Sequence, residues 1–376
     1  MLRTHDLVQL ATQYRERRVL TVYLHTAVTD PAAQRIWEVE LEHALEPLRR
    51  RIADADHGER EDFYAAVALL RQWLVSERAS LGAPGVVLAV APREVLFATA
   101  TATAVPNTAQ WGYGVFLAPL LHDVSLGAPS AVLVVDLQLA RLCRFTPPRH
   151  LETFETLESD AVEKLGDVEH RLGAGRSNMG RGTRGGTAAD VAERTLETGR
   201  DRLYARAIER ATDLAGAHGW IVIGGTTRSV AAARALVPTR LHDRLIALDH
   251  LDVQSGDSAI AAAVAAAINE REGARDQETV REIIEEFGAR GRGVIGLEAT
   301  RAMLERESVA DLLLSERFVS GHPQVADELL DRALGQGATV RQVHGEAASA
   351  VDREADGVAA RLRYPISANP PTETSS

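Results

Sequence analysis

The chain has little of three things that define particular protein classes. It contains a single cysteine, Cys143, which excludes an intramolecular disulfide and a zinc site built from cysteines. Its longest alanine-rich run, residues 259–268, is far shorter than the roughly 20 apolar residues that cross a bilayer, and its N-terminus lacks the apolar stretch of a secretory signal. Aromatic residues make up only 5% of the chain, so its cores must consist mainly of Ala, Leu, Val and Ile. These features predict a cytoplasmic globular protein with no membrane partner.

The chain also lacks an excess of positive charge, because its formal net charge is −11 over 376 residues. The protein as a whole is therefore not attracted to nucleic acid, and any such contact requires a local basic patch. The twelve histidines show no spacing that is typical of metal ligands. We therefore predict neither a metal site nor a cofactor.

The order of strand and helix patterns predicts an α/β fold with three domains. The N-terminal domain, residues 1–128, combines β-branched strand signals with two helical patterns, whereas its stretch 106–129 shows only turns and short apolar runs. The middle domain, residues 129–250, opens with two strands that a two-residue turn connects, and a long helical pattern follows later. Strands that alternate with helices predict an α/β sandwich here.

The α/β alternation starts again in the C-terminal domain, residues 251–366. This domain opens with two separate helical patterns, at 257–272 and 277–290, and continues with short strands and helices. The Pro/Ser/Thr-rich tail, residues 367–376, is expected to be disordered.

The strongest functional signal is a basic stretch at residues 171–206. It holds eight arginines and four acidic residues, a net charge of +4 in an acidic chain. Its glycine-rich part, residues 173–186, contains three arginines and no acid. Glycine allows a backbone to approach a ligand closely and arginine pairs with phosphate, so the stretch is suited to nucleic acid. A solvated surface loop without a partner explains the same composition, and the G-K-[ST] ending of a Walker A motif is absent.

Residues 181–194, RGTRGGTAADVAER, together with the arginine-bearing helix after them, resemble the Gly-Gly-Gln loop and following helix of archaeal and eukaryotic class-one release factors. The segments AVLVVD, LARLCRF, ADLLLSERF and GVAARLRY resemble other parts of the same proteins in the same order, over residues 130–365. The chain is thus identified as a member of the bacterial archaeo-eukaryotic release factor family. This resemblance implies a ribonuclease-H-like middle domain and a C-terminal α/β sandwich like the kink-turn-binding ribosomal proteins.

The resemblance also implies the site residues. Gly185 and Gly186 match the two glycines that let the family's loop reach the peptidyl-transferase centre, and Thr187 stands where the family has the catalytic glutamine. Thr187 keeps a backbone N–H, but its short β-branched side chain cannot copy a glutamine amide. The arginines implied to bind RNA are Arg171, Arg176, Arg181, Arg184, Arg194 and Arg200.

Residues 1–128 contain no motif like the one with which the decoding members of the family read stop codons. Similarity to Pelota and to Pelota-like bacterial hibernation factors therefore implies rescue of stalled ribosomes or occupation of idle ones. The implied partners are ribosomal RNA and peptidyl-tRNA, with a translational GTPase as a further candidate. The alternative is a peptidyl-tRNA hydrolase that releases nascent chains through the Gly-Gly loop.

Two other positions each allow a chemical and a structural interpretation. Asp136 ends an apolar strand, where a carboxylate either binds a metal ion or caps a turn. The stretch Ile223-Gly224-Gly225-Thr226-Thr227 joins a strand to a helix, where it either binds phosphate at the helix N-terminus or forms a tight turn. The structural interpretation is favoured in both cases.

Overall fold

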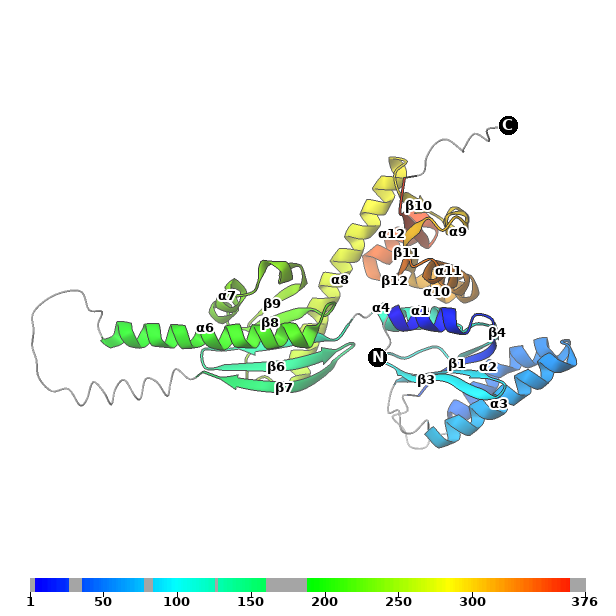
Figure 1. Cartoon of the computed structure of the whole chain (residues 1–376), viewed down its shortest axis with the longest axis horizontal. Coiled ribbons are helices and arrows are strands. Elements are labelled where there is room, and N and C mark those ends of the chain that lie inside the picture. The colour runs from blue at the N-terminus through cyan, green and yellow to red at the C-terminus, as the bar shows by residue number, and fades with distance from the viewer. Residues whose placement is uncertain (1–3, 27–35, 78–83, 126–127, 160–187, 366–376) are drawn as a thin grey trace, which may run out of the picture. The chain divides into compact units, whose positions relative to one another are not determined.

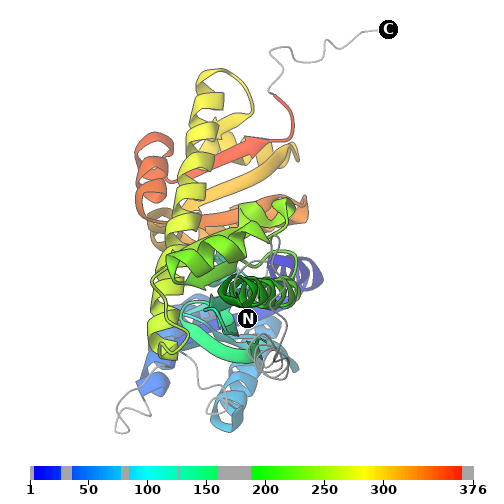
Figure 2. The ribbon, with the colours of Figure 1, turned by 90° about the vertical axis from the view of Figure 1, so that its left-hand side faces the viewer.

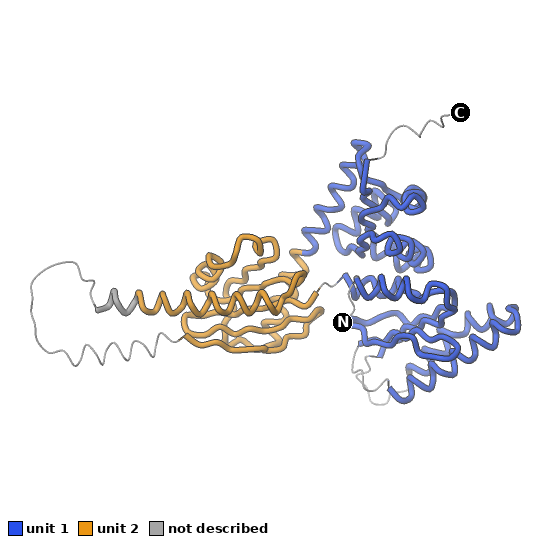
Figure 3. Tube along the Cα trace, viewed as in Figure 1, with its two compact units in different colours: residues 1–126, 272–376 blue, residues 127–271 orange. Residues whose placement is uncertain are grey.

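The computed structural model describes residues 4–26, 36–77, 84–125, 128–159 and 188–365 (Figure 1). These residues form three sheets with helices on their faces, which confirms the predicted mixed α/β class. The chain divides into two compact units (Figure 3): unit 1 comprises residues 1–126 and 272–376, and unit 2 comprises residues 127–271. The predicted tail, 367–376, lies outside the described residues.

The first sheet of unit 1 is antiparallel, and side-chain alternation along β1 (Arg18–His25) explains its two layers. Leu20, Val22 and Leu24 pack against helices on one face, while Val19 and Tyr23 contribute to a second core on the opposite face. The strand order is β3-β2-β1-β4. The other elements are β2 (Gly85–Ala91), β3 (Glu94–Thr101) and β4 (Thr108–Tyr113), with α2 (Ile36–Ala53) and α3 (His57–Glu77) on the first face.

The second sheet of unit 1 is formed by the last segment of the chain in the order β10-β13-β11-β12. Only β11 and β12 are parallel. Figure 2 shows α8 (Asp257–Gly288) and α12 (Gly345–Ala355) beside these strands, and Val280, Ile283 and Val351 form the core on that face. The remaining elements are β10 (Gly293–Ile295), α9 (Leu297–Glu305), β11 (Val309–Ser315), α10 (Glu316–Gly321), α11 (Pro323–Gly335), β12 (Thr339–Val343) and β13 (Val358–Leu362).

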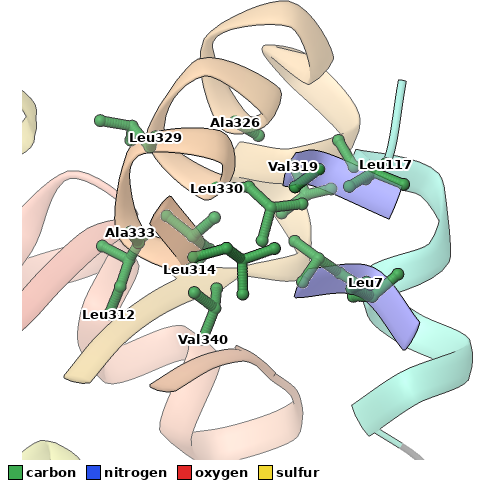
Figure 4. Close-up of a cluster of buried hydrophobic side chains, with 14 of the residues drawn as sticks. Leu7, Leu117, Leu312, Leu314, Val319, Ala326, Leu329, Leu330, Ala333 and Val340 are labelled. Atoms are coloured by element: carbon green, nitrogen blue, oxygen red, sulfur yellow. The ribbon is translucent and has the colours of Figure 1, made fainter. Parts of the chain in front are cut away.

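The first and last segments of unit 1 share one hydrophobic core. Leu7 of α1 (Thr4–Gln13) and Leu117 lie beside Val319 and Leu330 in this core (Figure 4). The contact also has a buried polar component, because the Asp327 carboxylate accepts hydrogen bonds from the backbone N–H groups of two consecutive residues of the first segment. Removal of either segment would therefore expose an apolar face that the other covers.

Unit 2 has a five-stranded sheet of order β7-β6-β5-β8-β9. The strand β5 (Ser130–Val135) pairs antiparallel with β6 and parallel with β8. Its alternate residues divide between two cores: Leu133 and Val135 face α6 and α7, whereas Val132 and Val134 face the first part of α8. The other elements are β6 (Leu139–Thr146), β7 (His150–Glu158), α6 (Ala188–Ala215), β8 (Ile221–Gly225), α7 (Thr227–Ala235) and β9 (Leu245–Asp249).

The structure differs from the sequence-based expectations in a few elements. The two helical patterns at 257–272 and 277–290 form one helix, α8, because the single Gly273 between them is not enough to end it. The stretch predicted as turns, 106–129, contains the strand β4, and the helices α1 and α12 were not expected. Unit 2 spans residues 127–271, and its second boundary falls within α8. The division into three domains, with its ribonuclease-H-like and ribosomal-protein-like assignments, stays a prediction.

Candidate nucleic-acid interface

The long helix α6 follows the glycine-rich part of the basic stretch, residues 173–186, which we call the Gly/Arg stretch. One side of α6 is packed on the sheet of unit 2. Leu203, Tyr204, Ala207 and Ala211 recur at the spacing of one helix face and are buried against β5 and β6. The Tyr204 hydroxyl donates a 2.8 Å hydrogen bond to the backbone carbonyl of Asp136 at the end of β5. Burial raises the pKa of Tyr204, so its phenol stays a donor at neutral pH. This half of the helix is therefore held firmly.

The N-terminal part of α6 lies outside that core. The exposed residues here are Arg194, Leu196, Glu197 and Thr198. Among the residues of α6 whose burial is described, Gly199 is the first that is buried. Even the apolar Leu196 is 41% exposed. Figure 1 shows this end of α6 extending past the ends of β6 and β7. The N-terminal part of α6 thus lies away from the body of unit 2.

The solvent side of α6 carries a ridge of three arginines, Arg202, Arg206 and Arg210, which we call the arginine ridge. They are exposed and spaced four residues apart, so they lie on one face about 6 Å apart along the axis. Arg206 donates to the backbone carbonyl of Glu158 at 3.1 Å. No salt bridge with a described residue occupies any of the three. These guanidinium groups are available to pair with phosphate.

Of the arginines predicted to bind RNA, only Arg194 and Arg200 are described. Arg194 is exposed on the projecting part of α6. Arg200, by contrast, is only 14% exposed, and its guanidinium is bound to Asp201 at 2.7 Å. Its position explains this, because it lies four residues before Tyr204 on the side of the helix that faces the sheet. Arg200 is therefore less accessible to a ligand than the arginine ridge. In the sequence, the ridge was not recognised as a group of arginines on one face.

The remaining predicted residues lie outside the part of the chain that the structure describes. They are Arg171, Arg176, Arg181, Arg184, Gly185, Gly186 and Thr187, with the glycine-rich stretch 173–186.

The Asp136 carboxylate caps a turn. Its Oδ1 accepts hydrogen bonds from the backbone N–H groups of Gln138 at 2.7 Å and of Leu139 at 2.6 Å, which closes the connection between β5 and β6. In the described ranges, no group of three or more His, Cys, Asp or Glu side chains is arranged to hold a metal ion. The favoured structural interpretation of Asp136 is confirmed.

The glycines between β8 and α7 serve close packing. A Cβ on Gly225, whose φ is +155°, would collide with the backbone carbonyl oxygen of Val135 on the neighbouring strand. A Cβ on Gly224 would lie 2.7 Å from the Leu251 side chain. Thr226 caps α7 by accepting a hydrogen bond from the Ser229 N–H at 3.3 Å. This geometry favours a tight, capped turn over a phosphate site.

Two further findings concern the reactivity of the single cysteine and the hydrophobicity of the helices. Cys143 is fully buried in the core of unit 2, and burial raises the pKa of its thiol, which disfavours the reactive thiolate. None of the helices in the described residues is both long enough and apolar enough to span a bilayer.

Comparison with known proteins adds one direct match. Residues 116–272 match the family model described as bacterial archaeo-eukaryotic release factor family 10. No curated protein matches the chain. The matched stretch contains the whole of unit 2, including α6 and the Gly/Arg stretch before it.

Solved structures of archaeal proteins show weaker similarity. Pelota of Archaeoglobus fulgidus is 14% identical, with 63% of this chain and 65% of that chain covered and a TM-score of 0.33. An archaeal translation termination factor, aRF1, is 15% identical over 96% of this chain and 99% of that chain, with a TM-score of 0.26. A model of ribosome-bound archaeal Pelota and ABCE1 contains a chain that is 16% identical, with 75% and 78% covered and a TM-score of 0.39. Because these TM-scores are low, the similarity to release factors rests on the family-model match. Over residues 116–272, which include the whole of unit 2, the chain is similar to the bacterial archaeo-eukaryotic release factors of family 10.

Proposed function

We propose that the protein is a cytoplasmic ribosome-binding factor that acts on stalled or idle ribosomes rather than in codon-specific termination. The observation that carries this proposal is the arginine ridge, Arg202, Arg206 and Arg210, on the helix that follows the Gly/Arg stretch. In a release-factor-like middle segment, these exposed guanidinium groups are suited to the phosphates of ribosomal RNA or tRNA. The ligand is therefore an RNA backbone, read without base specificity.

The distribution of charge supports this choice of surface. Unit 1 has 24 basic and 34 acidic residues, a net charge of −10, whereas unit 2 has 18 basic and 19 acidic residues, a net charge of −1. RNA is repelled by strong negative charge, so the nearly neutral unit, whose arginine ridge forms no salt bridge with a described residue, is the better candidate for contact.

The test is co-sedimentation of the full-length protein with idle and with stalled ribosomes at several salt concentrations. Binding is expected to weaken steeply as salt rises, because arginines that replace counterions on RNA give a salt-dependent affinity. Absence of binding to both ribosome states at low salt would overturn the proposal. Delivery by a translational GTPase belongs to the same proposal and predicts that binding to stalled ribosomes increases when that GTPase is supplied with a nonhydrolysable GTP analogue.

A second candidate function is hydrolysis of peptidyl-tRNA, for which the sequence Gly185-Gly186-Thr187 is the motivation. Attack of water on the ester needs a well-placed donor, and a misplacement of about 1 Å costs ~100-fold in rate. Thr187 has a hydroxyl on a stiff, short stem, so we expect the wild-type protein to release peptide poorly and Thr187→Gln to release it faster. Gly186→Ala should abolish residual release and leave ribosome binding intact. Release of labelled peptide by wild-type protein at the rate of a Gly-Gly-Gln factor would favour the hydrolase.

A further inference from the structure

A pair of histidines lies where the first and last segments of unit 1 meet. His122 belongs to α4 (Leu121–Ser125) in the first segment, and His344 follows β12 in the last. The His122 Nδ1 lies 3.2 Å from the His344 Nε2, and the two rings meet edge to face with centroids 4.8 Å apart. The other nitrogen of His344 lies 3.3 Å from Oε2 of Glu316. Both imidazoles are half-buried.

The contact between the two imidazoles depends on their protonation. A hydrogen bond between two ring nitrogens needs one N–H donor and one unprotonated acceptor. A neutral pair or a singly protonated pair meets this condition. In a doubly protonated pair, two N–H groups face each other and two positive charges lie within a few ångströms, so the contact becomes repulsive. Burial, and next the neighbouring His344, lower the pKa of His122, which agrees with a pair that resists its second proton.

Charged groups on the surrounding elements determine how much positive charge the pair tolerates. Asp123 of α4 and Glu316 of α10 lie near His122, and Asp276 of α8 lies near His344. The Asp123 carboxylate is occupied by two backbone N–H groups, at 2.7 and 3.0 Å, and Asp276 is paired with Arg341 at 2.7 Å. Glu316 is the described carboxylate that contacts the pair directly, and it can balance one positive charge but not two.

We propose that His122 and His344 form a pH-sensitive clamp between the first and last segments of unit 1. The clamp is closed while at least one of the two imidazoles is neutral, and it opens when both carry a proton. A neighbouring contact crosses the same junction, because the Gln342 N–H donates to the Ser125 hydroxyl oxygen at 3.1 Å. That amide is expected to lose protection when the clamp opens. Opening couples to the uptake of up to two protons, so it should be steep in pH.

Hydrogen exchange of the full-length protein at about pH 7.5 and about pH 5 tests the clamp, with rates corrected for intrinsic exchange. In the wild type, protection of residues 121–125 and 339–344 should fall about tenfold at the lower pH. His122→Asn places an amide near the former Nδ1 and takes up no proton, so it should keep its protection at pH 5. The matched control is His242→Gln in unit 2, where the ring contacts the Val237 carbonyl, and it should respond like the wild type.

Asp327, which is buried at the same junction, stabilises unit 1 more as pH falls, because burial raises its pKa to about 7. This effect opposes the expected opening of the clamp, so the comparison is repeated in an Asp327→Asn background. Equal protection of the wild type at both pH values in that background would overturn the clamp, as would an equal loss in His122→Asn. If His122→Asn does not fold, His344→Gln, which places an amide near the former Nε2, decides the question in the same way.

Discussion

The two units of this protein differ in charge and in how their cores are built. Unit 1, with a net charge of −10, joins the first and last segments of the chain across a buried carboxylate and a histidine pair. Unit 2, with a net charge of −1, is continuous in sequence and carries an exposed arginine ridge on α6. The difference shows that an acidic chain can still concentrate exposed basic residues in one unit, which is the arrangement that the proposed RNA contact requires.

The two units also differ in which parts of the chain their titratable side chains connect. Polar groups at the candidate site of unit 2, such as the Asp136 carboxylate and the Tyr204 hydroxyl, have hydrogen-bond partners within the same unit and hold its turns in place. The ionisable groups at the junction of unit 1 bridge segments that are about 200 residues apart in the chain. We therefore expect the stability of unit 2 to depend mainly on close side-chain packing, and the stability of unit 1 to depend on pH.

The largest effect is expected for Gly225→Ala, which tests whether the sheet of unit 2 depends on close packing at the β8–α7 turn. The new Cβ would collide with the Val135 carbonyl oxygen, and the φ of +155° is unfavourable for alanine. We expect unit 2 to lose about 3 kcal/mol or more of unfolding free energy, measured by urea denaturation. Gly256→Ala is the matched control, because a Cβ there meets nothing within 4 Å, and a loss of equal size in the control would contradict the packing account.

The second effect tests the pH sensitivity of unit 1. Burial raises the pKa of Asp327 from 3.8 to about 7, although the backbone N–H groups of Leu117 and Ala118 favour its ionised form. The folded-state pKa of Asp327 lies above its unfolded value. The stability that the protonated Asp327 contributes is therefore complete below about pH 4 and is lost as pH rises through about 7. Stability should fall by at most about 1.4 kcal/mol per pH unit within that window.

The measurement for Asp327 is urea denaturation from about pH 4 to about pH 8, a range that spans the window between the unfolded and folded pKa values, compared with Asp327→Asn. The asparagine can still accept the two backbone hydrogen bonds but does not ionise, so its unfolding free energy should vary less with pH. An identical pH dependence of both proteins would show that Asp327 is not the titrating group.

A smaller effect is expected for Tyr204→Phe. This substitution keeps the buried ring and removes only the hydrogen bond to the Asp136 carbonyl, which we expect to cost unit 2 about 1 kcal/mol. Hydrogen exchange in the anchored half of α6 should speed up accordingly, while the segments of unit 1 remain unchanged. Unchanged exchange in α6 would mean that the Tyr204 hydrogen bond does not help to hold the helix on the sheet.

The sequence predicted most strands and helices because their apolar residues repeat with clear periods. The β5–β6 hairpin and the long helix α6 are examples, with only two residues between the strands and a stripe of small and apolar residues on the helix. The strand β4 was missed because Trp111 is the one buried side chain in a stretch of otherwise partly exposed residues. The shared core of unit 1 was not predictable, since it depends on which faces of distant segments meet.

The candidate site stays a prediction, and the sequence alone places it no more closely than the basic stretch at residues 171–206. Charge counting found the basic stretch, but it gave every arginine equal weight. Helical geometry separates them: Arg200 shares a side with Tyr204 and Ala207, whereas Arg202, Arg206 and Arg210 occupy the solvent side. The spacing of the arginines along the helix already separates the two sides, but only the structure shows which side the sheet covers.

The most direct test of the central claim is the salt dependence of ribosome binding by two matched triple variants. In the first, Arg202, Arg206 and Arg210 of the arginine ridge are changed to Gln. In the second, three exposed arginines of unit 1 that form no salt bridge with described residues are changed in the same way: Arg93, Arg290 and Arg306. We predict that the slope of log affinity against log salt becomes shallower by about 2 to 3 for the ridge variant and stays unchanged for the other. Equal slopes for wild type and ridge variant, or an equal change in both variants, would contradict the assignment of the RNA contact to unit 2.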